Sequence, residues 1–169
     1  DSLDWELNTK EICKKAYMRI SILSKLKYVG MKTEDLLTIY KTFIRCLVEY
    51  CCVVWHSSLT VDQCNTIERI QRVCLKIILG PNYGGYETAL EMCELESLQL
   101  RREKLCLSFA KKCTKNTQHQ HLFPRTVADH DHQLRHPELY VVNRARTERY
   151  RQSAIPRMQR LLNSKLMDC

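Results

Sequence analysis

Two cysteines, a tryptophan and a histidine stand close together in residues 49–60, EYCCVVWHSSLT. Nucleophilic catalysis needs a thiolate beside a base, and His56 follows Cys51 and Cys52 within a few residues. Both cysteines, however, continue an apolar helical pattern, and a thiol in apolar surroundings has a raised pKa and reacts poorly. We therefore interpret this stretch as the end of an apolar helix with Trp55 in the core, followed by a turn and a helix cap.

A second group of possible metal ligands lies after residue 105. A structural zinc site takes four Cys or His ligands, usually from two close pairs. The two cysteines of this group lie about 10 Å apart along a helix, and two histidines follow in a polar segment. Residues 129–132, DHDH, fit an exposed polar loop better than a metal site. We predict no metal site or cofactor and keep one set as the zinc alternative: Cys106, Cys113, His119 and His121.

The ten cysteines do not form the pattern of a disulfide scaffold. No secretory signal is visible at the start, and the lack of an initiator Met suggests a piece of a longer chain. We therefore expect an intracellular protein, nuclear or cytoplasmic, with reduced thiols that act as small core residues. These thiols are Cys13, Cys46, Cys64, Cys74, Cys93, Cys106 and Cys113.

The composition favours helices, because Leu, Ile, Lys, Arg and Glu dominate and only four Gly and four Pro occur. Apolar residues recur at steps of three and four, as they do on amphipathic helices. No apolar run reaches the roughly 18 residues of a membrane span. The sequence thus predicts an all-α fold: a small bundle of four to six amphipathic helices, a less ordered His-rich segment and a C-terminal helix.

Helix boundaries follow from capping residues and breakers. We expect helices over residues 9–29, from Thr33 to about residue 52, over 61–79, over 98–116 and from Ser153 onward. Asn8 or Thr9, Thr33, Thr60, Ser97 and Ser153 are the expected caps, and Gly30 and Gly80 the expected ends. The predicted buried stripes are Leu36, Tyr40, Phe43, Leu47 and Cys51, widened by Leu37, Ile44 and Val48, then Cys64, Ile67, Ile70, Cys74 and Ile77, then Leu98, Leu105, Phe109 and Cys113.

Three regions are predicted along the chain. We expect residues 1–116 to form a helical domain. Residues 117–143, which are polar and rich in histidine, form a loop or linker. Residues 144–169 form a basic C-terminal helical segment.

The net charge of +8 is unevenly spread. Residues 97–125 carry seven basic and one acidic side chain, and residues 144–160 carry six and one. Such local excess favours an anionic partner such as nucleic acid, although each cluster could also be a solvated helix face. The candidate nucleic-acid contacts are Arg69, Arg72 and Lys76 on one helix, and Arg101, Arg102, Lys104, Lys111 and Lys112 on another.

The order of several segments resembles a known family. They read LLTIYKTFIRCLVEYCCVVWHSSLT at 36–60, IERIQRVCLKIILG at 67–80, LESLQLRREKLCLSFAKKC at 95–113 and LFP at 122–124. Together with the opening DSLDWELNTKEICKK and the tail ARTERYRQSAIPRMQRLLN, they resemble the C-terminal part of reverse transcriptases from non-LTR, jockey-like retrotransposons.

This resemblance implies an origin and a partner. The enzymes of the family use a Tyr/Phe-x-Asp-Asp loop to bind catalytic metals, and this sequence has no adjacent aspartates. It therefore corresponds only to the thumb and post-thumb region, which grips the RNA/DNA primer–template duplex. Other catalytic motifs are also missing. We predict no catalytic residues and expect no activity from this chain alone, although its parent is an RNA-directed DNA polymerase.

Two alternatives stay open. The chain could be a domesticated helical remnant that acts as a structural or protein-interaction subunit of a larger assembly, so that another protein or the rest of the polymerase is its partner. It could also be a zinc module. Tyr40 and Trp55 could stack on bases, but core packing is the preferred interpretation.

Overall fold

The computed structural model describes residues 5–125 and 139–164. Helices make up most of this part of the chain, which contains no strand and a single isolated antiparallel bridge between Arg125 and Tyr140. The predicted all-α class and small bundle are therefore confirmed.

Tertiary contacts divide the chain into two compact units. Unit 1 comprises Asp1–Cys52 and Leu59–Arg102, and unit 2 comprises Val53–Ser58 and Glu103–Cys169. The chain thus passes between the units after Cys52, after Ser58 and after Arg102, whereas the sequence suggested boundaries at residues 116 and 143.

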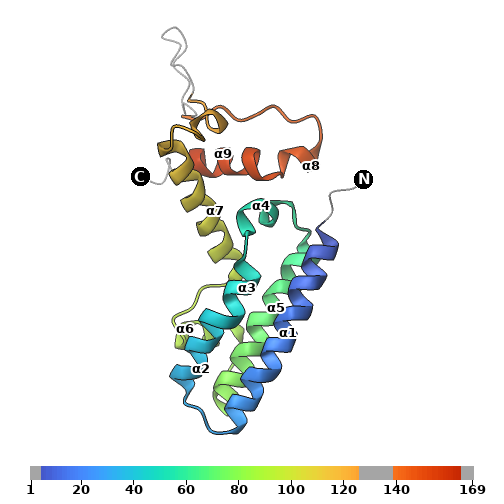
Figure 1. The fold of residues 1–169 in the computed structure, drawn as a ribbon, viewed down its shortest axis with the longest axis vertical. Helices are drawn as coiled ribbons and strands as arrows, with labels where there is room; N and C mark the ends of the chain where they lie inside the picture. Colours follow the sequence, from blue (N-terminus) through green and yellow to red (C-terminus); the bar gives the residue numbers. More distant parts are fainter. Residues whose placement is uncertain (1–4, 126–138, 165–169) are drawn as a thin grey trace. The chain divides into compact units, whose positions relative to one another are not determined.

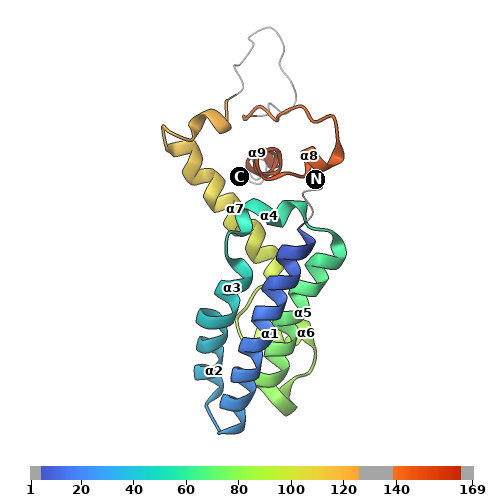
Figure 2. The ribbon, with the colours of Figure 1, turned by 45° about the vertical axis from the view of Figure 1, so that its right-hand side comes forward.

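Unit 1 is built around two long helices that run side by side (Figures 1 and 2). Its elements are α1 (Glu6–Tyr28), α2 (Thr33–Ile39), the π-helix η1 (Tyr40–Arg45), α3 (Cys46–Glu49), α5 (Val61–Leu79), the 3₁₀ turn η3 (Gly80–Asn82), α6 (Tyr86–Met92) and the first turn of α7 (Leu98–Lys115). Its fully buried apolar side chains come from most of these helices: Ala16, Leu23, Leu36, Ile44, Val48, Ile67, Ile70, Cys74, Leu75, Ile78, Ala89 and Leu98.

Only part of the wide stripe predicted on residues 36–51 is buried. Leu36, Tyr40, Ile44 and Val48 are buried as expected, whereas Phe43 is 38% exposed and Cys51 lies outside the core. The reason is the π-helix η1, because its wider turns keep residues four apart on one face. Phe43 instead packs under the Arg19 guanidinium, 4.4 Å from its ring centre.

The α5 stripe also shifts by one residue at its end. Ile67, Ile70 and Cys74 are buried as predicted. Ile78 is fully buried, whereas Cys64 and Ile77 are only half-buried.

Capping explains several helix boundaries. Thr60 and Gln63 form a reciprocal capping box at the start of α5, and Ser97 accepts the backbone N–H of Leu100 at 3.2 Å. Gly80 ends α5 with a φ of 55° that favours glycine. Other expected caps are wrong: α1 begins after Trp5 without a side-chain cap, and Thr33 is already inside α2.

Unit 2 contains η2 (His56–Ser58), the rest of α7, η4 (Gln120–Leu122), α8 (Glu148–Arg151) and α9 (Ala154–Ser164). The short helix α4 (Cys52–Trp55) begins in unit 1 and ends in unit 2. α9 begins just after Ser153, as predicted. The core of unit 2 combines residues of α7, the following segment and α9: Cys106, Ala110, Cys113, Phe123, Tyr140, Met158 and Leu162.

Two amides of α9 fix the extended segments of unit 2. Asn163 accepts the backbone N–H of Tyr140 at 3.0 Å and donates to its carbonyl at 2.9 Å. Gln159 accepts the N–H of Asn143 and donates to the carbonyl of Leu122, both at 2.9 Å. These bonds replace the ladder partners that isolated extended backbone lacks. The DHDH run at 129–132 lies outside the described residues.

Candidate nucleic-acid interface

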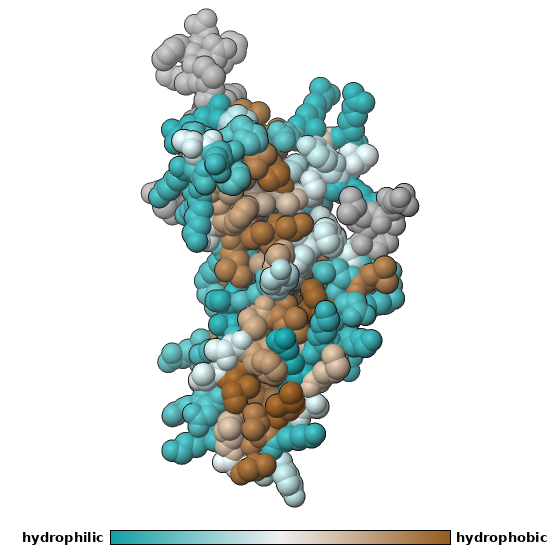
Figure 3. Space-filling model, in the orientation of Figure 1, coloured by the Kyte–Doolittle hydropathy of each residue, from teal (hydrophilic) through white to brown (hydrophobic). Residues whose placement is uncertain are grey.

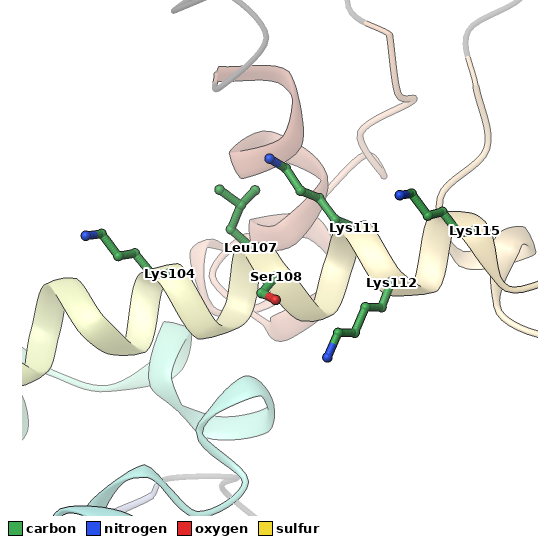
Figure 4. Close-up of a pocket in the computed structure, with 6 residues that line it drawn as sticks. All are labelled: Lys104, Leu107, Ser108, Lys111, Lys112 and Lys115. Atoms are coloured by element: carbon green, nitrogen blue, oxygen red, sulfur yellow. The ribbon is translucent and has the colours of Figure 1, made fainter. Parts of the chain in front are cut away.

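The second half of α7 displays a row of lysines. Lys104, Lys111 and Lys115 project to the same side of the helix, with Leu107 between Lys104 and Lys111, and Lys112 projects the other way (Figure 4). All four lysines are exposed and, with Leu107 and Ser108, line a shallow depression of about 380 Å³. With a rise of 1.5 Å per residue, the row from Lys104 to Lys115 extends over about 16 Å.

Carboxylates are sparse in this part of the sequence. Lys111, Lys112 and Lys115 form no ion pair within residues 5–125 and 139–164. The only carboxylate of the sequence between residues 97 and 125 is Glu103, which pairs with Arg157 at 3.6 Å. We call this surface the α7 lysine row: Lys104, Lys111, Lys112 and Lys115.

The two arginines at the start of α7 are placed differently from our expectation. Arg102 is fully buried, so the expected outward position is wrong for this residue. Arg101 is half-buried and forms an ion pair with Glu49, whose carboxylate also lies 3.6 Å from Arg45. Arg101, Arg45 and Glu49 thus form an ion-pair cluster within unit 1, in which the charge of Arg101 is already paired.

Three candidates lie on the exposed face of α5. Arg69, Arg72 and Lys76 are exposed, and none forms an ion pair within the described part of the chain. The Arg72 guanidinium lies 4.8 Å from the ring centre of Tyr86, and the Lys76 ammonium lies 5.5 Å from that of Tyr83.

The two tyrosines were not among the candidates predicted from the sequence. Tyr86 donates its hydroxyl hydrogen bond to Glu68, and the other bonds of this carboxylate come from the backbone N–H groups of Leu98 and Gln99 at 2.9 and 3.1 Å. Burial, followed by the bond to Glu68, raises the pKa of Tyr86, which therefore stays neutral. The turn-rich sequence NYGGYE after α5 could have pointed to these two tyrosines, because such a loop returns the chain along the preceding helix.

The aromatic residues considered for base stacking lie inside the fold. Trp55 is 3% exposed and Tyr40 is fully buried. Tyr40 donates to the Gln71 side chain at 2.5 Å, and Gln71 donates to the Glu96 carbonyl at 2.8 Å. Burial raises the pKa of Tyr40 well above its ordinary value. Both side chains are core residues, as the preferred interpretation held.

The zinc candidates are not brought together. Cys106 and Cys113 are buried in the core of unit 2, whereas His119 and His121 are exposed. Within residues 5–125 and 139–164, no three His, Cys, Asp or Glu side chains gather closely enough to hold a metal ion.

The thiols divide into two groups. Burial raises the pKa of Cys74 to about 12, and burial also raises that of Cys13, Cys93 and Cys113. Cys46 and Cys51 are exposed, so a core role for Cys46 is wrong.

Comparison with protein-family models, with curated proteins and with solved structures found no match. The resemblance to retroelement polymerases therefore stays a prediction. Among the described residues, no helix has the length and apolar character needed to cross a bilayer.

Proposed function

We propose that this chain is a non-catalytic, nucleic-acid-binding part of a retroelement RNA-directed DNA polymerase. It grips the RNA/DNA primer–template duplex through the basic faces of its helices. The observation that carries the proposal is the α7 lysine row, in which Lys111, Lys112 and Lys115 are exposed without a carboxylate partner in the described structure.

A lysine row suits a phosphate backbone for a simple physical reason. Each lysine that neutralises a phosphate releases condensed counterions, so affinity falls as salt rises. A strand of duplex DNA carries one phosphate per about 3.4 Å of axis, so a row of about 16 Å spans several phosphates of one strand. Such contacts position the duplex without reading its sequence.

The test is a titration of a fluorescent RNA–DNA duplex at several salt concentrations. The variant K111Q/K112Q/K115Q should bind more weakly, and its salt slope should be smaller by about one per lysine. The matched control is K14Q/K15Q/K25Q, which removes the same charge from exposed lysines of α1.

The outcomes separate three cases. A large loss in the α7 variant with a small loss in the α1 variant supports the proposal. Equal losses mean that net charge alone drives binding, and the α7 row is then not the interface. No binding by the unaltered chain at low salt overturns the proposal.

A structural or protein-interaction role is the second candidate, and α1 supplies the observation that favours it. Leu7, Met18 and Ile22 fall on one side of this helix, and Val29 follows its last residue; these four side chains are between 45% and 82% exposed. Figure 3 also shows hydrophobic side chains, in brown, gathered between hydrophilic ones over the helices of unit 1. Light scattering after size-exclusion chromatography tests this role, since a monomer at all concentrations counts against self-association.

A further inference from the structure

We propose that the exposed face of α5 is a second phosphate-binding surface, in which Tyr83 and Tyr86 hold Lys76 and Arg72 in position for the backbone of a nucleic acid. This inference rests on the proposed function and adds a site in unit 1, separate from the α7 lysine row in unit 2. We call it the α5 cation face: Arg69, Arg72 and Lys76.

The spacing of these cations fits a row of phosphates. Positions 69, 72 and 76 are three and four residues apart, so they share one face of the helix. They extend over about 10 Å along the axis. All three are exposed, and within the described ranges none lies in an ion pair.

The aromatic rings position the charge without neutralising it. A tyrosine ring attracts a cation through its quadrupole and carries no net charge. Arg72 over Tyr86 and Lys76 over Tyr83 therefore lose side-chain freedom and keep their full positive charge. Because these two side chains are ordered before binding, the entropic cost of binding a phosphate is smaller. Arg101 differs from these two residues, because its guanidinium forms an ion pair with Glu49.

The rings are themselves fixed by unit 1. The Tyr86 hydroxyl is bound by Glu68, and both oxygens of this carboxylate also accept backbone N–H groups at the start of α7. Tyr83 follows η3, and its half-buried side chain packs against the core cluster that contains Leu75 and Leu79. Neither ring depends on the cation for its place.

Two carboxylates, Glu68 and Glu87, lie near this face. Glu68 is occupied by Tyr86 and by the start of α7. Glu87 is exposed and close enough to act on Tyr86 electrostatically. E87Q should therefore strengthen phosphate binding at this face.

The experiment uses the full chain and the same RNA–DNA duplex, and compares charge removal with ring removal. R72Q/K76Q should lower the salt slope by about two, one per lost phosphate contact. Y83L keeps every charge, so its salt slope should be unchanged, while its affinity should fall about two- to tenfold, which corresponds to the cost of ordering one long side chain on binding. Y83F keeps the ring and should bind like the unaltered chain. Circular dichroism melting of each variant confirms that the fold is kept.

Failure of this inference is distinguishable from failure of the proposed function. If R72Q/K76Q binds like the unaltered chain while K111Q/K112Q/K115Q is weakened, the α5 cation face is not a site but the proposed function stands. If Y83L lowers the salt slope, or if Y83F is as weak as Y83L, the rings do not position the cations and the inference is overturned. If the unaltered chain does not bind, the proposed function fails first.

Discussion

Each of the two units of this molecule is stabilised by a different kind of contact. Unit 1 is an apolar core between long helices, and side chains such as Leu23, Ile44 and Ile70 are fully buried there. Unit 2 has a smaller core and depends on Asn163 and Gln159, whose amides bond to backbone far along the chain. The apolar helix contacts of unit 1 can be predicted from helical periodicity in the sequence. The amide-to-backbone hydrogen bonds of unit 2 have no periodic pattern in the sequence.

In the part of the chain that the structure describes, each unit contains both paired and unpaired cations, and in unit 2 the pairs include Arg157 with Glu103 and Arg151 with Glu148. In unit 1, Arg101 and Arg45 share the carboxylate of Glu49, and Arg72 and Lys76 lie on tyrosine rings. In unit 2, Lys111, Lys112 and Lys115 form no ion pair within the described residues. A basic composition is thus a poor guide to a binding surface until the partner of each cation is known.

The apolar core of unit 1 should give the largest effect. I70A removes a fully buried side chain, and the cavity should cost about 2–5 kcal/mol of the free energy of unfolding. Hydrogen exchange should show the loss of protection in α1 and α5. V61A, at a side chain that is 76% exposed, is the control and should change little. Equal effects would contradict the assigned core.

The amide clamp of unit 2 should give the next largest effect. N163A removes both bonds to the backbone of Tyr140, at about 1 kcal/mol each. Protection should be lost in α9 and around residue 140, while α1 and α5 keep theirs. S164A, at an exposed neighbour, serves as the control. Exchange that rises evenly over both units would show that they are not separately stabilised.

The capping box at α5 should give a smaller effect. T60A removes the acceptor of the Gln63 N–H, and the expected loss is about 1 kcal/mol. T60S keeps the hydroxyl and should restore most of the stability in a urea titration. If T60S is as unstable as T60A, the methyl group rather than the cap is responsible.

Thiol labelling should separate exposed from buried cysteines without changing stability. In the native protein, iodoacetamide should modify Cys46 and Cys51 quickly, since both are exposed. Cys74 should stay unmodified at pH 8, because it is buried with a pKa of about 12 and holds almost no thiolate. Peptide mass spectrometry identifies each site. Rapid labelling of Cys74 in the native state would contradict its place in the core.

Much of the fold could be predicted from the sequence. The helices α5 and α9 begin where Thr60 and Ser153 indicated, and Trp55 is buried as expected. These features depend on neighbours within one or two helical turns, which a single sequence displays directly.

The remaining features of the structure could not be predicted from helical periodicity. The π-helix η1 leaves Phe43 exposed, although the helical pattern placed this residue in the centre of the buried stripe. Arg102 shares the buried face of α7 with Leu98 and Cys106, although an arginine is usually assigned to the surface. Of the eight nucleic-acid candidates, six are exposed: Arg69, Arg72, Lys76, Lys104, Lys111 and Lys112.

Lysine footprinting tests the central claim most directly. The full chain is acetylated briefly with and without an RNA–DNA duplex at low salt, and each lysine is quantified by mass spectrometry. The account predicts that Lys111, Lys112 and Lys115 are protected by the duplex, whereas Lys14, Lys15 and Lys25 on α1 stay reactive. Full reactivity of the α7 lysines in a saturated complex, or equal protection of the α1 lysines, would contradict it.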